Sequence, residues 1–394
     1  MPGAMRMLFT SAGGRGHSDP LLPIARAARR AGHAVAFCCR PPMAPSLSAE
    51  GFAAFTAGPP IPAPSAIAPL APLDRERELR VLRDGFAGRG IGRRRAAELP
   101  ELAKSWKPDV FVCDETDFGA LVAAERLDLP YATVVVSAAG SFLRPDVLTE
   151  PLQALRAEHR LSPDPDLASL TRYCVIAPLP PAFRDPGYPL GATAHPIRPA
   201  PLEADGAPPP SWLGADSEIV YFTLGSVFNL ESGDLFARVL RGIAELPIDV
   251  VVTVGSAVEP AALGPQPANV RVEQFVPQAA LLPRCRTVVS HGGSGTVLGA
   301  IAFGAPQVLL PMGADQPWNA ARCEALGVGR ALDPIACSST DVRDAVAALL
   351  RDPDYRERAA RLRDETLALP GADHAVGLLE RLATDREPIL SGAH

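Results

Sequence analysis

Residues 288–296 read Val-Val-Ser-His-Gly-Gly-Ser-Gly-Thr, and this stretch decides how the fold of the whole chain is interpreted. The two valines are typical of the end of a buried parallel strand, and the apolar spacing from Thr296 to Phe303 predicts a helix. We therefore expect Gly292, Gly293 and Gly295 to lie on the turn that joins this strand to this helix.

A turn of this kind can bind an anion, because glycines let backbone N–H groups approach it and a helix N-terminus carries partial positive charge. The ring of His291 and the hydroxyls of Ser294 and Thr296 would add side-chain donors. The alternative is a plain strand-to-helix turn in which Ser294 caps the helix. A second apolar run, which ends at Asp315-Gln316, repeats the strand-then-polar pattern and favours the binding site.

The length and composition favour two globular domains. With 394 residues, 47% of them apolar, the chain can form two hydrophobic cores. Its formal net charge is −6 and it has no long run of Lys or Arg, so nucleic acid is not an expected partner. Its first apolar run is too short for a signal peptide, and no stretch reaches the roughly 20 apolar residues of a membrane span. We therefore expect a cytoplasmic protein without a membrane span.

The cysteines predict no metal centre. There are seven of them, and none forms a Cys-x-x-Cys pair. Several lie in apolar strand-like runs, so we expect small buried hydrophobic residues rather than metal ligands or disulfides.

The first half of the chain begins with a predicted βαβ unit. Its elements are a strand at 6–11, a helix at 21–31 and a strand at 34–39. The glycine loop between the first two resembles a dinucleotide loop, but it lacks the third glycine, and the second strand ends in Arg40 rather than an acid. An NAD site is therefore disfavoured.

A further strand at 107–114 ends in Asp114. It is followed by a predicted helix at 118–127 and a strand at 131–137. Open α/β sheets bind ligands at the carboxyl ends of their strands, so we expect His17 and Asp114 to share one crevice.

The middle of the first half is less regular. The Pro- and Ala-rich stretch 58–72 predicts a mobile loop, and the Arg- and Glu-rich stretch 73–103 predicts helices. Irregular segments of this kind tend to line variable pockets.

The second half restarts the alternation of strands and helices. We expect strands at 219–223, 249–254 and 270–275, and helices at 234–246, 340–350 and 353–367. The predicted division of the chain is an N-terminal domain at 1–200, a Pro-rich linker at 201–215, a C-terminal domain at 216–373, and a helical tail at 374–394 that crosses back to the first domain.

His17 is the candidate general base in the first half. An unperturbed imidazole has a pKa of about 6.5, which suits the removal of a proton from an acceptor hydroxyl. Asp114 would hold the ring tautomer and stabilise the imidazolium. The alternative is that His17 merely caps the helix that begins near Leu21.

The second half supplies candidates for binding a nucleotide and a sugar. The ring of Phe275 could stack on a nucleobase whose edge the backbone of Val276 would contact, although Phe275 could also be an ordinary core aromatic at a strand end. Ser226 could join the glycine turn in holding a diphosphate. Asp315 and Gln316 would pair with sugar hydroxyls, since each offers more than one hydrogen-bonding atom in a plane.

These residues together carry a resemblance to a known family. The motifs are Gly16-His17-x-x-Pro20, Cys113-Asp114, Thr223-Leu-Gly-Ser226, Phe275-Val-Pro-Gln278, His291-Gly-Gly-Ser-Gly-Thr296 and Asp315-Gln316-x-x-Asn319. In this order and spacing the chain resembles, over nearly its whole length, the nucleotide-sugar-dependent glycosyltransferases of the GT-B fold. The likeness is strongest to the bacterial antibiotic and macrolide glycosyltransferases of family 1.

The resemblance implies an α/β fold of two Rossmann-like, doubly wound domains that face each other across a cleft. It implies inverting transfer of a (deoxy)sugar from a donor in the C-terminal domain to a hydroxyl of a natural-product aglycone in the N-terminal domain, with His17 as base and Asp114 assisting it. The donor-binding positions that follow are Ser226, Phe275, Val276, Gln278, His291, Gly293, Ser294, Gly295, Thr296, Asp315 and Gln316.

The chain departs from the family pattern in two places. Relatives often carry Trp where this chain has Phe275, and plant relatives carry a ribose-binding glutamate where it has Gly299. Without that acceptor a ribose 2′-hydroxyl gains nothing, so we expect a thymidine diphosphate (dTDP) donor rather than a uridine one. We expect no metal and no cofactor beyond the nucleotide sugar, because the helix end, His291 and the hydroxyls can stabilise the leaving diphosphate.

Two other functions are compatible with two Rossmann-like domains. A nucleotide-sugar epimerase would need no acceptor pocket, which the variable segment 58–103 argues against. A catalytically silent partner of a true transferase would have no use for both His17 and Asp114. The sequence leaves open the sugar, the aglycone and the choice between a monomer and a homodimer.

Overall fold

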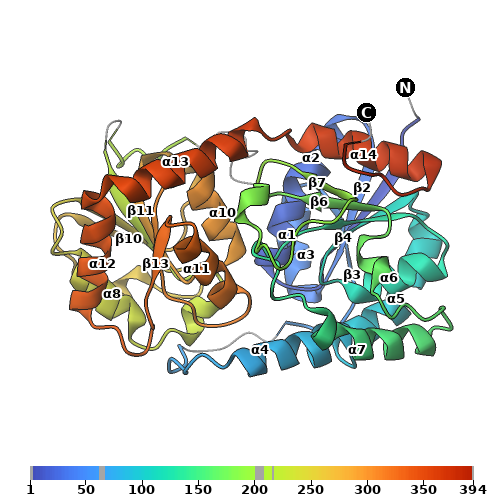
Figure 1. Ribbon diagram of the computed structural model, residues 1–394, viewed down its shortest axis with the longest axis horizontal. Coiled ribbons are helices and arrows are strands. Elements are labelled where there is room, and N and C mark those ends of the chain that lie inside the picture. Colours follow the sequence, from blue (N-terminus) through green and yellow to red (C-terminus); the bar gives the residue numbers. More distant parts are fainter. Residues whose placement is uncertain (1–2, 62–66, 200–207, 215–216, 393–394) are drawn as a thin grey trace.

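Two α/β domains lie next to each other in the computed structural model, which describes residues 3–61, 67–199, 208–214 and 217–392 (Figure 1). The N-terminal domain contains a seven-stranded parallel sheet in the order β3-β2-β1-β4-β5-β6-β7. Its strands are β1 (Arg6–Thr10), β2 (Ala34–Cys39), β3 (Ala53–Thr56), β4 (Val110–Asp114), β5 (Tyr131–Val134), β6 (Cys174–Ala177) and β7 (Ala194–Pro196).

The C-terminal domain contains a six-stranded parallel sheet in the order β10-β9-β8-β11-β12-β13. Its strands are β8 (Ile219–Thr223), β9 (Asp249–Thr253), β10 (Val270–Glu273), β11 (Cys285–Ser290), β12 (Gln307–Leu309) and β13 (Gly329–Ala331). The two sheets confirm the predicted fold class of two doubly wound α/β domains.

Helices cover the sheets in both domains (Figure 1). The N-terminal domain contains α1 (Arg15–Ser18), α2 (Leu22–Arg30), α3 (Ala44–Ala49), α4 (Arg75–Arg80), α5 (Ile91–Trp106), α6 (Phe118–Arg126) and α7 (Pro145–Glu158), with a π-helical turn over Val81–Ala87. The helices that follow are α8 (Leu235–Ile243), α9 (Gln278–Leu281), α10 (Ser294–Ala302), α11 (Gln316–Ala325), α12 (Ser339–Arg351), α13 (Pro353–Ala368) and α14 (Ala372–Asp385).

The strand sequences explain why the sheets are buried. Central strands such as Val110–Asp114 are continuous apolar runs rather than alternating ones, as expected for strands that helices cover on both faces. Phe37 and Phe111 of the first sheet and Phe222 of the second are fully buried. All seven cysteines are buried free thiols, which confirms their interpretation as core residues.

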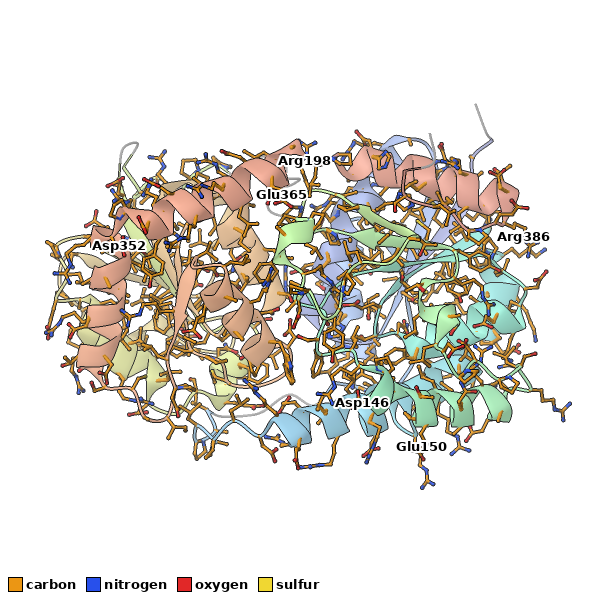
Figure 2. All side chains as sticks on the ribbon, viewed as in Figure 1. Asp146, Glu150, Arg198, Asp352, Glu365 and Arg386 are labelled. Carbon is orange, nitrogen blue, oxygen red and sulfur yellow. The ribbon has the colours of Figure 1, made fainter. Side chains whose placement is uncertain are left out.

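The last helix returns to the first domain. Helix α14 packs against α2, beyond the end of α13 in the C-terminal domain (Figure 1). Glu380 of α14 lies 2.9 Å from Nε2 of His33, and the amide of Ile389 donates to the carbonyl of Tyr173 at 2.7 Å. Arg386, labelled in Figure 2 at the far end of this helix, contacts Asp128. The C-terminal segment therefore ties the two domains together.

The domains also contact each other through the segment before α4. The amide of Ala68 donates to the carbonyl of Leu230 at 2.6 Å, and the amide of Gly233 donates to the carbonyl of Ala68 at 3.0 Å. Leu70 packs against the core of the C-terminal domain. On another side of the boundary, Glu365 (Figure 2) accepts from the amide of Ala182 at 3.1 Å. These contacts join the two domains at two separate places.

Several predicted boundaries shift. Most of the predicted linker 201–215, and part of the predicted loop 58–72, lie outside the residues that the structure describes. The strand predicted at 131–137 ends at Val134. The amide of Val135 still bonds to the carbonyl of Ile176 in β6, but the amides of Val136 and Ser137 bond to the side chain of Glu115 instead of to a neighbouring strand. Among the described residues, no helix is long and apolar enough to cross a membrane.

Candidate active site

The strand order of each sheet reverses at one place, and both places carry candidate residues. In the first sheet, β1 and β4 are neighbours with further strands running outward on either side; β8 and β11 hold the same position in the second sheet. Open α/β sheets bind ligands at such a switch point, outside the carboxyl ends of the strands. His17 and Asp114 lie at the first switch point, and Ser226 and His291 lie at the second.

The side chain of His17 stands beside Asp114, with a third side chain between them. His17 belongs to α1, the short helix after β1, and Asp114 is the last residue of β4. Nδ1 of His17 is 3.5 Å from Oδ1 of Asp114, which is too long for a good hydrogen bond. The hydroxyl of Thr116 is 3.0 Å from the same Nδ1 and 2.5 Å from Oδ1 of Asp114. The hydroxyl of Thr116 therefore connects Asp114 to His17. Thr116 is not among the site residues expected from the sequence.

Hydrogen bonds keep the buried Asp114 ionised. Its carboxylate accepts from the amides of Ala12 and Thr116, each at 2.7 Å. Burial raises its pKa, but the charge of His17 and these hydrogen bonds lower it by more, so the pKa of Asp114 lies below its ordinary value. The pKa of His17 changes in the opposite direction. Burial lowers it, and the charges of Asp114 and of further carboxylates raise it by more, so it lies above 6.5.

Two neighbours, Phe86 and Gly13, lie close to the ring of His17. Phe86, in the π-helical turn, stacks on it with ring centroids 5.5 Å apart and an angle of 14° between the planes. A Cβ at Gly13 would lie 2.0 Å from Cδ2 of the ring, so only glycine fits there. His17 makes no cap hydrogen bond to the following helix, so the alternative that it caps the Leu21 helix is wrong. Phe86 gave no sequence signal, because it lies about seventy positions away in an irregular helical segment.

The glycine turn of the second domain surrounds His291 closely. His291 follows β11, and Gly292 after it has a φ of +86°, which favours glycine. A Cβ at Gly225 would lie 2.7 Å from the His291 ring, and one at Gly293 would lie 2.5 Å from Nε2. Burial lowers the pKa of His291 to about 4, so the ring is neutral near pH 7. Its buried Nδ1 has no hydrogen-bond partner among the described residues.

The helix after this turn starts earlier than predicted. Helix α10 begins at Ser294 rather than Thr296, because the amide of Val297 already bonds to the carbonyl of Gly293 at 3.0 Å. Gly295 is therefore an exposed residue of the first helical turn rather than of the loop. The N-cap residue is Gly293, so the alternative that Ser294 caps the helix is wrong.

Ser294 and Asp315 are joined in a network that crosses the domain boundary. The Ser294 hydroxyl donates to Oδ2 of Asp315 and accepts from the amide of Ala138 at 2.7 Å. Asn319 donates to the same Asp315 oxygen at 2.8 Å and accepts from the amide of Ala139 at 3.1 Å. The single hydrogen of Ser294 is thus used on Asp315, which corrects the expectation that it donates to a diphosphate.

Two further candidates, Gln316 and Gln278, make hydrogen bonds within the protein. Oε1 of Gln316 accepts from the amides of Met312 and Gly313, at 2.8 and 3.2 Å, and shapes the loop before α11. Nε2 of Gln278 donates to the hydroxyl of Thr296 at 3.2 Å. The Gln316 side chain thus holds the loop that carries Asp315, and Gln278 fixes the orientation of Thr296.

Phe275 lies exposed between the two domains. The residue is 63% exposed, so the alternative of an ordinary core aromatic is wrong. The guanidinium of Arg15, from α1 of the first domain, lies 5.8 Å from the ring centroid. The side chain of Val276 is buried, which leaves its backbone as the part that can face a ligand, and Ser226 is exposed after β8.

Side chains of the two domains also interact near Asp315. The charge of Asp315 contributes to the raised pKa of His17, although the two residues come from different domains. Glu78 of α4 accepts from the amide of Ala314 at 2.9 Å, directly before Asp315. Burial raises the pKa of Asp315, and the hydrogen bonds from Ser294 and Asn319 partly oppose that change. Among residues 3–61, 67–199, 208–214 and 217–392, no group of three His, Cys, Asp or Glu side chains is arranged to hold a metal ion.

Comparisons with known proteins identify related chains. A family model described as "Erythromycin biosynthesis protein CIII-like, C-terminal domain" matches residues 237–382. The chain is 31% identical to 10-deoxymethynolide desosaminyltransferase of Streptomyces venezuelae, over 99% of this chain and 100% of that protein. It is 29% identical to TDP-daunosamine transferase DnrS of Streptomyces peucetius, over 98% of this chain and 99% of that protein.

Solved structures show the same fold. The glycosyltransferase VinC, crystallised in complex with dTDP, matches with a TM-score of 0.77 and 27% identity, over 97% of this chain and 100% of that one. SnogD from Streptomyces nogalater matches with a TM-score of 0.74 and 27% identity, over 96% and 99%.

The fold and the paired switch points define a GT-B glycosyltransferase. With a relative that is 31% identical over essentially its full length, the chain belongs to the family 1 natural-product glycosyltransferases. It is an enzyme that acts on a sugar donor and an aglycone, which disfavours the alternatives of an epimerase and of a silent partner.

Proposed function

We propose that this enzyme transfers a deoxysugar from dTDP to a hydroxyl of a natural-product aglycone, with inversion at the anomeric carbon. The observation that supports this proposal most is geometric: His17 lies beside Asp114 and Thr116 in the first domain, and Ser294, which bonds to Asp315 in the second domain, also bonds to the amide of Ala138 in the first. A base for the acceptor and a carboxylate for the donor sugar thus meet at one domain boundary.

The chemistry assigned to His17 is general base catalysis. The acceptor hydroxyl loses its proton to Nε2 as its oxygen attacks the anomeric carbon, and the bond from that carbon to the diphosphate oxygen breaks. Attack opposite the leaving group inverts the configuration. Asp114 stabilises the imidazolium that forms, because its carboxylate is buried and ionised beside the ring.

The leaving diphosphate is assigned to the start of α10. Backbone amides at Gly293 and Gly295 and the hydroxyl of Thr296 lie at the helix N-terminus, where the helix dipole favours an anion. The neutral ring of His291 adds one N–H donor. These donors stabilise the negative charge that develops on departure, and we propose that the reaction requires no metal.

The donor base is assigned to the exposed ring of Phe275. Thymidine is favoured over uridine because Gly299, buried in α10, provides no acceptor for a ribose 2′-hydroxyl. Two relatives support this choice through what their names say of them: VinC was crystallised with dTDP, and DnrS is a TDP-daunosamine transferase. The desosaminyl and daunosamine transferases among the relatives favour a deoxysugar as the group transferred.

The test is a panel of dTDP- and UDP-activated sugars incubated with the purified chain and with natural-product aglycones such as 10-deoxymethynolide, the acceptor in the name of one relative. Mass spectrometry would detect the product, and NMR coupling constants would give its anomeric configuration. We expect transfer from a dTDP-deoxysugar with inversion. Transfer from UDP-sugars alone, or a product with retained configuration, would contradict the proposal.

A further inference from the structure

The hydroxyl of Thr116 occupies the space between the ring of His17 and the carboxylate of Asp114. It is 3.0 Å from Nδ1 of the ring and 2.5 Å from Oδ1 of the carboxylate, whereas these two atoms are 3.5 Å apart. Thr116 is buried, and its own amide donates to the same Oδ1 at 2.7 Å. Its backbone amide and its hydroxyl are therefore both hydrogen-bonded to Asp114. The hydrogen-bonding path from the ring to the carboxylate therefore runs through this hydroxyl.

The hydrogen-bond chemistry of the three groups allows only one direction. An ionised carboxylate can only accept, so Asp114 must receive the single hydroxyl hydrogen of Thr116. The Thr116 oxygen then has only lone pairs to offer to the ring, and Nδ1 of His17 must be the donor. A neutral imidazole carries one N–H, so its proton is on Nδ1 and Nε2 is free.

We propose that Thr116 is a positioning residue. By donating its hydroxyl hydrogen to Asp114 it offers only an acceptor to His17, and so keeps the proton of the neutral ring on Nδ1. This inference rests on the proposed function, in which His17 takes a proton from the acceptor. That role requires Nε2 to be unprotonated before each turnover. A histidine with its proton on Nε2 could not accept one there.

The surrounding residues fix the ring in this orientation. Gly13 lies against the ring so closely that no Cβ would fit, and Phe86 stacks on it. The neighbour Glu115 is directed elsewhere, since its carboxylate accepts from the amides of Val136 and Ser137. With the ring held in place, the identity of the group that meets Nδ1 decides which nitrogen is protonated.

The proton balance during turnover is simple. The acceptor proton moves to Nε2, so the ring becomes an imidazolium with a proton on each nitrogen. The Nδ1 proton stays in its bond to Thr116, and the hydroxyl proton stays in its bond to Asp114. Thr116 and Asp114 gain and lose no proton, and the cation is stabilised through the intervening hydroxyl.

The experiment measures the histidine tautomer directly. The full chain is labelled with ¹⁵N-histidine, and the ring nitrogens are observed above the pKa of His17, where protonated and free nitrogens differ widely in chemical shift. The signals of His17 are identified by their absence from the His17→Gln spectrum. Three further samples are compared: the unaltered chain, Thr116→Val, which removes the hydroxyl at nearly constant shape, and Thr116→Ser, which retains it.

In the unaltered chain we expect Nδ1 of His17 to be protonated and Nε2 to be free. In Thr116→Val we expect a large fraction of the ring to move to the Nε2–H form, and Thr116→Ser should restore the Nδ1–H form. A proton on Nε2 in the unaltered chain would overturn the proposal, even if the variants failed to fold. So would an unchanged Nδ1–H form in a folded Thr116→Val protein.

Kinetics give a second readout that a purely structural role would not reproduce. In Thr116→Val we expect kcat to fall about 10- to 100-fold with KM for the nucleotide sugar unchanged, and Thr116→Ser to recover most of the loss. An unchanged kcat would overturn the proposal. The NMR measurement needs no turnover, so failure of this inference is distinguishable from failure of the proposed function, which His17→Gln tests.

Discussion

The hydroxyl of Ser294 accepts a hydrogen bond from the amide of Ala138 at 2.7 Å, and this contact joins the donor domain to the acceptor domain. The same hydroxyl donates to Asp315, the candidate sugar-binding carboxylate. Glu115, next to Asp114, holds the preceding loop by accepting from the amides of Val136 and Ser137. The loop that packs against Ser294 is therefore anchored beside Asp114.

Replacing Ser294 should weaken this junction. In Ser294→Ala the buried amide of Ala138 loses its partner and Oδ2 of Asp315 keeps only the donor from Asn319, which should lower the free energy of unfolding by about 1 to 3 kcal/mol. Denaturant unfolding measures the change. The control is Ser105→Ala, because that hydroxyl is exposed and donates only to the carbonyl of Leu102; its effect should stay within about 0.5 kcal/mol. Equal changes in the two variants would contradict the role of Ser294.

The pH dependence of turnover should reflect the raised pKa of His17. The base must be neutral, so kcat/KM should fall as the pH decreases through an apparent pKa above 6.5. In Asp114→Asn the charge that raises this pKa is removed. The acid limb should then move to lower pH, while the rate on the plateau falls about 100-fold or more because the imidazolium is no longer stabilised.

The control for this change is Asp146→Asn, since Asp146 is an exposed residue of α7 that pairs with Arg144 at the surface (Figure 2). Its pH profile should match that of the unaltered chain. An acid limb that stays in place in Asp114→Asn would show that Asp114 does not set the pKa of the base.

A methyl group at Gly295 should weaken nucleotide binding without lowering the stability of the fold. A Cβ there meets nothing within 4 Å, and the residue lies in the first turn of α10, so Gly295→Ala should leave the stability unchanged or raise it by up to about 1 kcal/mol. If the diphosphate lies on this turn, the methyl group should nevertheless weaken dTDP binding several-fold. Calorimetry would measure the affinity, and an unchanged Kd would place the diphosphate elsewhere.

The ring of Phe275 should contribute to nucleotide affinity and little to stability. The ring is exposed, so Phe275→Ala should unfold like the unaltered chain, but it should bind dTDP more weakly by about 1 to 3 kcal/mol if a base stacks on the ring. Phe275→Trp offers a larger stacking face and should bind at least as tightly. Equal affinity in all three proteins would exclude Phe275 from the base site.

The sequence predicted those parts of the site that follow long apolar runs. His17, Asp114 and His291 each come after a buried strand, and the placement of ligands at carboxyl strand ends brings such residues together without further information. The start of α10 was misplaced by two residues, because the glycines around Ser294 look like a loop although Gly293 already accepts the first helical hydrogen bond.

Contacts between distant segments could not be predicted. Phe86 reaches the ring of His17 from a π-helical turn, and Glu78 reaches the amide of Ala314 across the domain boundary. Neither position carries a pattern that distinguishes it from an ordinary helical residue. Thr116 is an intermediate case: its position two residues after Asp114 could have suggested a role, but only the distances show that its hydroxyl stands between the acid and the base.

The turnover of His17→Gln, measured beside its affinity for dTDP, tests most directly whether His17 is the base of a glycosyl transfer. Glutamine keeps a polar side chain but cannot take up the acceptor proton, so the rate should fall by about 100-fold or more while the Kd for dTDP stays within a few-fold. His291→Asn is the matched variant on the donor side, and it should instead weaken dTDP binding roughly tenfold. A His17→Gln protein that retains full turnover of a hydroxyl acceptor would contradict the assignment of the base.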